Sequence, residues 1–537
     1  MKDENHHDVV VIGSGCTGGT AAWQLSQRGL RVLLLEAGDH VAAKDSQPNS
    51  GLGTHLSRAW RVLIARCQQT QSLHPAYWLY PPRLFVDDKK HPYSTPDGRP
   101  FVWIRGRQVG GRSLTWTGLS LRLSPYELEG WPLLYEDLAP YYDEVERLMG
   151  ICGARDDLPQ LPDGNYRPGK SLTPAESIFR DRIASRWPER HVIIGRGIDH
   201  TTENGWSLKT SLGSTLEAAG RTGLLEIRAN SIARRLVADQ RTGCVSGVEI
   251  IDTKTKTSRL VSARAVVVCA STFESVRLLL NSQSAAHPSG LGNSSGLLGR
   301  YIMNKVSRSV TFEMTLDQTD VIHPLSASES FVIPRYENVG SQTAEIRGGF
   351  GIWGAIQRMP PPPQKLAAAS RGLAFGFLIG YGECLPYFDN KLELNANVLD
   401  EWGIPTLRID VRWRENEEQM AERIQRDLRA MVAAAGGSVV DAAASTGSVS
   451  RHLADRVLKA GSTPGAFVHE VGGARMGTSP QNSVVNGYCQ LWDSRNVVVT
   501  DGACWPTAGW QNPTLTMMAI TARSCSFIAD SFTRGDL

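Results

Sequence analysis

The chain has 537 residues with a formal net charge of +3, and 41% of its residues are hydrophobic and 21% charged. This length exceeds one ordinary hydrophobic core and predicts two or more domains. The composition is typical of a globular protein, and the near-neutral charge excludes a broad basic surface, so we expect no nucleic-acid partner.

The cysteines and the N-terminus bear on metals and on location. Nine cysteines are scattered without a CxxC pair, which argues against a zinc site or an iron–sulfur cluster and suits a reducing compartment. The start, "MKDENHHDVVVIGSG", lacks the features of a signal peptide, and no run of about 18 apolar residues occurs. We therefore predict a cytoplasmic protein with no membrane partner and no bound metal.

The segment "HDVVVIGSGCTGGTAAWQLSQRGLRVLLLE" predicts a strand at 9–12, a glycine turn, a helix and a second strand. Gly13 would allow the tight turn, Gly15 would let a pyrophosphate approach the backbone, and Gly18 would let the helix lie close to the sheet. Glu36 ends the second strand and could bind both ribose hydroxyls, which argues against NADP. This is the pattern of a dinucleotide fold, but it does not separate FAD from NAD. The alternative is a glycine-rich turn beside a solvated Glu36.

Further nucleotide-domain segments follow in chain order. Strands are predicted in 224–237 and 245–252, and "ARAVVVCASTFESVRLLLNS" predicts a strand at 265–270 and a helix from 274 to 280. The region 313–415 has a different character, with the strand-like stretches "SESFVIPRY", "LAFGFLIGYG", "KLELNANV" and "TLRIDVRW" around a four-proline run. A helix is predicted at 417–437, where glycines stop it.

Three separated motifs together resemble the glucose–methanol–choline (GMC) oxidoreductase family. They are "GSGCTGG" with Glu36, "RGRQVGGRSLTW" at 105–116, and a C-terminal pair made of "HEVGGARMG" and "VVVTDGACWPTAGWQNPTLT". Within the family, the sequence is most similar to the branch of pyranose and glycoside oxidases and dehydrogenases. The resemblance covers most of the chain and is weakest at 155–205.

The resemblance implies an α/β fold, α+β overall, in which an FAD-binding Rossmann-like domain carries an inserted substrate domain built on an antiparallel sheet. The expected FAD-binding domain is discontinuous and comprises residues 1–116, 205–312 and 462–537. Residues 117–204 and 313–461 would form the substrate-binding domain.

The resemblance also implies an FAD cofactor, and Thr115 bears on its attachment. Some members of the branch tether FAD through a histidine in the loop "GG-x-S-x-x-W", and Thr115 occupies that position here. Threonine has no comparable nucleophile, so we expect non-covalent FAD.

His469 and Asn512 are the expected catalytic pair. By the resemblance, His469 would take the hydroxyl proton of an alcohol as general base, and its usual pKa of about 6.5 suits that role. Asn512 would hold the substrate oxygen. The alternatives are a surface or core histidine, and a helix N-cap at Asn512 with Pro513 as the first helical residue.

Other residues are assigned to the cofactor by the resemblance. They are Arg105, Gly110, Gly111, Ser113, Thr115, Ile232, Asp501, Gly502 and Thr514. Glycine-rich turns and a plain strand core at Ile232 are the alternatives. Arg475 could bind substrate, but we favour a structural salt bridge. Trp103, Trp116, Trp505 and Trp510 flank the motifs, as sugar-binding platforms or as simple packing.

These inferences predict an FAD-dependent oxidoreductase that oxidises a CH–OH group of a sugar, glycoside or polyol. The small-molecule substrate would give its hydride to the flavin, and dioxygen or another acceptor would take the electrons. A non-sugar alcohol such as an aryl or terpenoid alcohol, and a flavoprotein with a non-redox lyase or isomerase role, stay open as alternatives.

Overall fold

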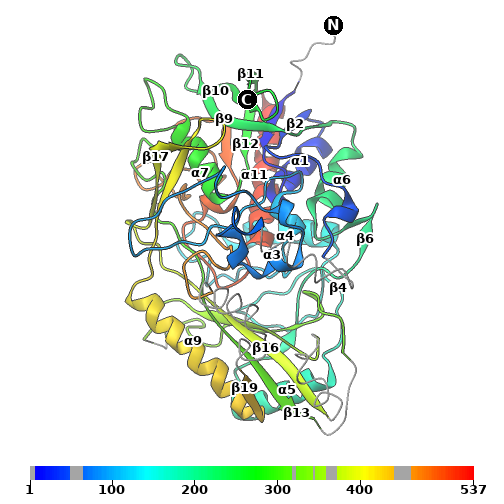
Figure 1. Ribbon diagram of the computed structural model, residues 1–537. Coiled ribbons are helices and arrows are strands. Elements are labelled where there is room, and N and C mark those ends of the chain that lie inside the picture. The colour runs from blue at the N-terminus through cyan, green and yellow to red at the C-terminus, as the bar shows by residue number, and fades with distance from the viewer. Residues whose placement is uncertain (1–6, 49–63, 317–321, 343–344, 359–371, 441–460) are drawn as a thin grey trace.

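The computed structural model describes residues 7–48, 64–316, 322–342, 345–358, 372–440 and 461–537. The chain forms an upper part that contains both termini and a lower part built around a second sheet (Figure 1). The four-proline run, residues 360–363, lies outside the described residues.

The helices and strands have the following bounds. The helices are α1 (Cys16–Gln27), α3 (Pro75–Leu79), α4 (Tyr135–Met149), α5 (Pro174–Arg186), α6 (Thr215–Gly220), α7 (Thr272–Asn281), α9 (Glu415–Ala434) and α11 (Thr514–Arg534). The strands of the upper part are β1 (Val9–Ile12), β2 (Val32–Leu35), β8 (Leu225–Arg228), β9 (Ser231–Ala238), β10 (Val245–Asp252), β11 (Ser258–Ser262), β12 (Ala265–Val268), β17 (Lys391–Leu399), β18 (Pro405–Asp410) and β20 (Val497–Val499). Those of the lower sheet are β5 (Ile193–Ile194), β13 (Val306–Thr315), β14 (Phe331–Ile333), β15 (Phe350–Ile356), β16 (Leu373–Gly382) and β19 (Gly437–Val440). Two-residue strands pair as β3 (Cys152–Gly153) with β4 (Arg167–Pro168) and β6 (Thr202–Glu203) with β7 (Trp206–Ser207).

The upper part is organised by a parallel five-stranded sheet with the order β20-β12-β1-β2-β8. Strands β1, β2, β12 and β20 are buried along their whole length, which explains why their sequences are continuous apolar runs. Helix α1 packs against α11 and α6. The carboxyl ends of β1, β2 and β12 meet at one edge, where ligands of such folds bind.

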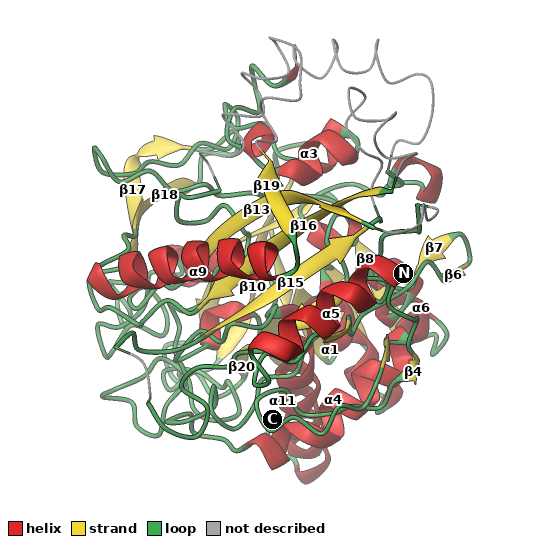
Figure 2. Cartoon of the chain, turned by 90° about the horizontal axis from the view of Figure 1, so that it is seen from below, coloured by secondary structure: helices red, strands yellow, loops and turns green. Residues whose placement is uncertain are grey.

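The lower part is a six-stranded sheet with the order β19-β13-β16-β15-β14-β5, whose pairs are all antiparallel. Helix α9 lies across it, with α5 beside it (Figure 2). Gly380 and Gly382 of β16 make this contact close, since a Cβ at Gly380 would lie 2.3 Å from Cγ2 of Ile424 and one at Gly382 would lie 2.3 Å from Sδ of Met420.

The parallel upper sheet and the antiparallel lower sheet together confirm the expected combination of a parallel sheet with an antiparallel sheet.

The local predictions hold with small shifts. The strand at 9–12 is confirmed, and the helix predicted from 274 begins earlier, at Thr272. Helix α9 runs over Glu415–Ala434 rather than 417–437. It begins two residues earlier because the Glu417 side chain accepts a hydrogen bond from the backbone of Arg414, the N-cap residue.

Two features bear on the expected domains. Strand β5 joins the antiparallel sheet through β14, although it lies far from β14 in sequence. Strands β17 and β18 form a separate two-stranded sheet and contact α7 of the upper part. The domain boundaries themselves stay a prediction.

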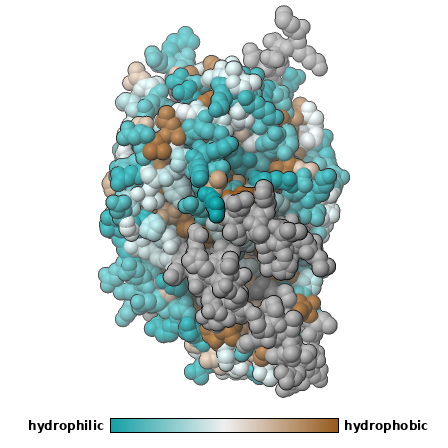
Figure 3. All heavy atoms as spheres, viewed as in Figure 1, coloured by the Kyte–Doolittle hydropathy of each residue, from teal (hydrophilic) through white to brown (hydrophobic). Residues whose placement is uncertain are grey.

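Hydrophilic residues dominate the described upper surface of the face shown in Figure 3. Among the described residues, none of the helices combines the length and the hydropathy that a bilayer crossing requires.

Candidate active site

A cavity of about 850 Å³ begins at the carboxyl ends of β1, β2 and β12 and reaches the antiparallel sheet. At the first end it is lined by the glycine turn after β1, by Glu36 and by Ser271. At the other end it is lined by Trp353, Phe377 and Tyr381 of β15 and β16. This is the place and the size expected of a cofactor and substrate site.

The glycine turn fits a pyrophosphate. Gly13 has φ +98°, and a Cβ at Gly18 would lie 1.8 Å from the carbonyl oxygen of Gly13, so both positions need glycine for backbone reasons. A Cβ at Gly15, in contrast, would meet nothing within 4 Å. Gly15 lines the cavity and leaves free space there, as the approach of a phosphate to the backbone requires. Gly111, with φ +53°, also lines the cavity, and its Cβ would lie 3.2 Å from the Cα of Gly15.

Glu36 ties the turn together. Its Oε2 accepts hydrogen bonds from the backbone nitrogen of Ser14 at 3.1 Å and from Oγ of Ser14 at 2.6 Å, and its Oε1 accepts from the nitrogen of Gly38 at 2.9 Å. Burial raises the pKa of the Glu36 carboxyl. The side chain lines the cavity, and each carboxylate oxygen can accept more than one bond, so the expected ribose contact is geometrically open.

The loop at 105–116 is held to this turn. The nitrogen of Gly110 donates to Oγ of Ser14 at 2.9 Å, and Gly110 has φ +99° and does not line the cavity. The Ser113 hydroxyl donates to the carbonyl of Gly110 at 2.5 Å and accepts from the nitrogen of Ser211 at 3.0 Å. Thr115 lines the cavity, and its hydroxyl donates to the carbonyl of Arg112 at 3.3 Å.

Arg105 and Ile232 line the cavity as well. The guanidinium of Arg105 lies 4.2 Å from the ring centre of Trp103, and its Nη2 donates to the carbonyl of His91 at 2.6 Å. Burial lowers the pKa of Arg105 to about 10. Ile232 belongs to β9, where it faces Ile251 across the strand pair and is buried.

The C-terminal motif contributes the carboxyl group of Asp501 and the first residue of α11 to the cavity wall. Oδ2 of Asp501 accepts from Oγ of Ser275 at 2.5 Å, and burial raises the pKa of Asp501 to about 6. Asp501 and Thr514, the first residue of α11, line the cavity. Gly502 does not, and a Cβ there would lie 2.5 Å from Oγ1 of Thr272, so it serves close packing.

His469 and Asn512 meet at the cavity. Nδ2 of Asn512 lies 3.2 Å from Nε2 of His469, and the His469 ring lies 5.8 Å from the ring of Tyr381. Nδ1 of His469 and Oδ1 of Asn512 have no hydrogen-bond partner among the described residues. Burial, and then the charges of Lys305 and Arg112, hold the pKa of His469 well below 6.5, so the imidazole is neutral at neutral pH.

The N-cap alternative for Asn512 is wrong by one residue. Pro513 is assigned as the N-cap, α11 begins at Thr514, and no side chain caps the helix start. The Asn512 side chain therefore lies outside the helix and is directed to His469.

The backbone before His469 is strained. Val468 has φ +53°, which is rare for a β-branched residue, and its nitrogen donates to the carbonyl of Gly465 at 3.0 Å in a tight turn. Such conformations cost on the order of 1–3 kcal/mol and concentrate at functional sites. The turn fixes where His469 enters the cavity.

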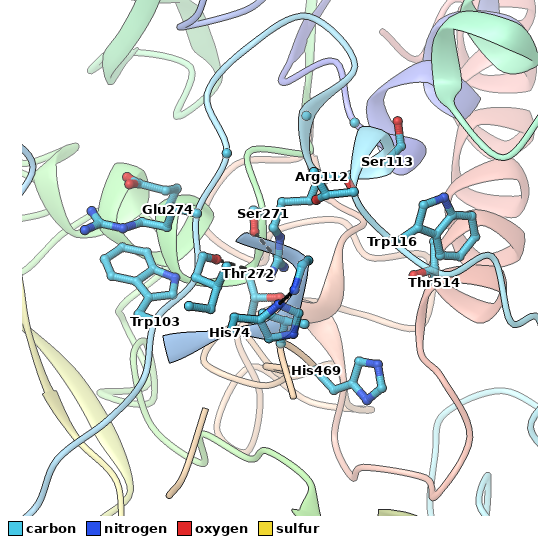
Figure 4. A pocket seen from close by; sticks show the side chains of 18 of the residues that line it. His74, Trp103, Arg112, Ser113, Trp116, Ser271, Thr272, Glu274, His469 and Thr514 are labelled. Atoms are coloured by element: carbon cyan, nitrogen blue, oxygen red, sulfur yellow. Dashed lines mark hydrogen bonds between the residues drawn. The ribbon is translucent and has the colours of Figure 1, made fainter. Parts of the chain in front are cut away.

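Sequence reasoning missed two cavity residues, His74 and Arg112, which line the same pocket as His469 (Figure 4). Nδ1 of His74 accepts from the nitrogen of Ala76 at 3.2 Å, at the start of α3. Arg112 stands inside the motif "GGRSLTW", and its charged side chain was the sequence signal that could have identified it as a cavity residue.

The remaining expectations concern packing. The salt bridge expected for Arg475 does not occur among the described residues; its guanidinium lies 4.5 Å from the ring centre of Tyr301 instead. Trp103 and Trp116 line the cavity, whereas Trp505 and Trp510 are buried away from it. Across the described residues, no three His, Cys, Asp or Glu side chains gather as a metal site.

Comparison with known proteins agrees with this geometry. The model of the family "FAD dependent oxidoreductase" matches residues 8–288, more than half of the chain, and that of "GMC oxidoreductase" matches residues 386–521. The chain is 29% identical to 2-methyl-1,2-propanediol dehydrogenase of Mycolicibacterium austroafricanum, over 98% of this chain and 95% of that protein. It is 24% identical to a C-glycoside 3-oxidase of Arthrobacter globiformis, over 98% and 95% of the two chains.

Solved structures show the same fold. Pyridoxine 4-oxidase from Mesorbium loti superposes with a TM-score of 0.61 at 18% identity, over 97% of this chain and 99% of that one. A formate oxidase from Aspergillus oryzae RIB40 gives a TM-score of 0.64 at 15% identity, over 99% and 100% of the chains. The chain belongs to the FAD dependent oxidoreductase family, and its residues 386–521 match the C-terminal domain of the GMC oxidoreductases.

Proposed function

We propose that the protein oxidises an alcohol group of a sugar, glycoside or polyol to a ketone or aldehyde. The relatives named for a diol and for a C-glycoside support a small hydroxylated substrate. Trp103 and Trp116 in the cavity wall support a ring-shaped one, since aromatic faces suit sugar rings. Dioxygen or another acceptor would remove the electrons afterwards.

The observation that carries the proposal is the 3.2 Å contact between Asn512 and His469. When the Asn512 amide donates to Nε2, that nitrogen carries a lone pair. The pKa of His469 lies well below 6.5, so the lone pair is available at neutral pH. A substrate hydroxyl that reaches this point can donate its proton to Nε2 while the Asn512 amide holds its oxygen.

The cofactor and the walls complete the site. Bound FAD supplies the acceptor for the hydride that leaves the carbinol carbon. The glycine turn, Glu36, Asp501 and Thr514 would hold it without a covalent bond, since Thr115 offers no nucleophile. Phe377, Phe467 and Tyr381 would exclude water around the reacting carbon.

Those same apolar walls favour a second candidate, a non-sugar alcohol such as an aryl or terpenoid alcohol. Anaerobic mixing of the holoenzyme with a panel of sugars, glycosides, diols and aryl alcohols separates the two. Loss of flavin absorbance with sugars or polyols is expected. Bleaching by aryl alcohols alone would favour the second candidate, and a product formed without bleaching would mean a non-redox role. Admission of air then tests dioxygen as acceptor.

A further inference from the structure

Arg112 enters the cavity with its hydrogen-bonding capacity largely unused. Its contacts are all long: Nη1 lies 3.4 Å from the carbonyl oxygen of Ile104, Nη2 lies 3.4 Å from Oγ of Ser271, and both nitrogens lie 3.4 Å from Oε2 of Glu470. Charge-assisted bonds of a guanidinium are usually about 2.7–2.9 Å long. The side chain is 30% exposed, so donors remain directed at the cavity.

Glu470 is the counterion of Arg112. Its side chain is only 2% exposed, and its Oε1 has no hydrogen-bond partner among the described residues. Within the described part of the chain, its Oε2 is held only by the two long contacts from Nη1 and Nη2 of Arg112, so the buried carboxylate is poorly compensated. The pair therefore places one cation at the cavity surface and one anion behind it, directly beside His469 in the chain.

The charge of Arg112 acts on both halves of the site, the glycine turn and the part around His469. Its charge acts on the pKa of five groups: Cys16, His74, His469, Glu470 and Asp501. Cys16 begins α1 behind the glycine turn, and His469 is the proposed base. A cofactor that joins these two places must pass within the field of this guanidinium.

We propose that Arg112 is the cation that stabilises negative charge on the flavin ring, and that Glu470 moderates its strength. Oxidised flavin is neutral, but it becomes an anion when it takes up two electrons and one proton, or when a nucleophile adds to N5. A fixed positive charge beside the ring favours both changes. The inference rests on FAD binding and not on the proposed role of His469.

Sulfite tests the inference without an alcohol. It adds to flavin N5: the N5–S bond forms, an electron pair moves onto the pyrimidine half of the ring, and the yellow absorbance bleaches. Arg112→Gln should weaken sulfite binding by at least roughly tenfold, and the same factor on a two-electron reduction equilibrium corresponds to about 30 mV. Arg112→Lys, which keeps the charge, should lie nearer to the wild type.

The neighbouring carboxylate supplies the opposing variant. Glu470→Gln keeps the shape of the side chain but removes its charge, so the holoenzyme should bind sulfite more tightly. Because the two variants are expected to move in opposite directions, a general disturbance of the loop cannot imitate the result. Arg107→Gln is the matched control, since Arg107 lines the cavity near Glu274, at 3.6 Å, and should leave sulfite binding unchanged.

Two results would overturn the inference. If Arg112→Gln weakens FAD retention while the loaded variant binds sulfite as the wild type does, Arg112 contacts the phosphates. If Arg112→Gln and Glu470→Gln shift sulfite affinity in the same direction, the pair serves packing only. A holoenzyme that no alcohol reduces would contradict the proposed function and leave the sulfite result standing.

Discussion

The amide of Asn512 and the imidazole of His469 lie 3.2 Å apart, although 43 residues separate them in the chain. The contact joins the start of α11 to the strained turn at Val468. Both residues line the cavity that the glycine turn opens at its other end. The pair is thus positioned by the turn before His469 and by the segment that leads into α11, and acid–base chemistry on a bound alcohol needs such a fixed geometry.

Replacement of His469 by alanine should slow flavin reduction by substrate roughly 10²- to 10⁴-fold, because the general base is lost. FAD content should stay the same, since the side chain is directed to the substrate end. Anaerobic single-turnover kinetics and a substrate dissociation constant give the two readouts. A variant that reduces its flavin at the wild-type rate would rule out the base role.

Asn512→Asp should move the pH profile of flavin reduction. A carboxylate 3.2 Å from the ring would stabilise the imidazolium and raise the pKa of His469, so the acid limb should shift to higher pH. In the wild type, where the pKa lies well below 6.5, the rate should stay constant down to about pH 6.5 and fall only below it. Asn512→Ala is the control and should slow the reaction without this upward shift. If Asn512→Asp and the wild type have identical acid limbs, the side chain at position 512 does not influence the pKa of His469 during the reaction.

Glu36→Ala should weaken FAD retention by one or two charge-assisted hydrogen bonds, about 1.5–3 kcal/mol each. The structure adds a control, because Glu36 also bonds Ser14. Ser14→Ala removes that internal bond but keeps the carboxylate, so it should retain FAD better than Glu36→Ala. Equal losses in both variants would mean that Glu36 only supports the turn.

The flavin should be released when the protein is denatured with acid, because Thr115 cannot form the covalent link. Colour is expected in the supernatant after precipitation. Thr115→His gives the informative comparison: it restores the residue type that tethers FAD in related enzymes. Yellow pellets from the wild type would contradict the expectation of non-covalent FAD.

His91 should make the protein less stable in acid. Its ring stacks on Trp402 at 4.7 Å, and burial, with the charges of Arg107 and Arg105, lowers its pKa to about 2, although Glu401 lies 3.3 Å away. The unfolded chain takes up this proton below about pH 6.5 and the native chain does not, so the free energy of unfolding should fall by about 2 kcal/mol by pH 5.

Denaturation of the holoenzyme at pH 7 and pH 5 measures this loss. His91→Gln should remove it, whereas His200→Gln, at a side chain that is 68% exposed, should not. An unchanged pH dependence in His91→Gln would show that other groups carry the acid sensitivity.

The sequence alone determined the local elements of this protein. The apolar run Val9–Ile12, bounded by a glycine, is typical of a strand that is covered on both faces. Gly13 and Gly18 stand where the backbone of the following turn leaves no room for a side chain. These constraints act over a few residues, so they can be read from spacing. The motif around His469 and the motif around Asn512 likewise identified the two residues that we propose as the catalytic pair.

Only the tertiary structure decided which side chains meet. The hydrogen bonds that link Glu36 to Ser14, and Ser14 to Gly110, join three segments whose approach depends on how helices and loops pack. Arg112 faces Glu470 across 358 residues of chain, and no local pattern encodes that distance. Burial, which sets the pKa of His469, is likewise a property of all surrounding segments together and appears only when the chain is folded.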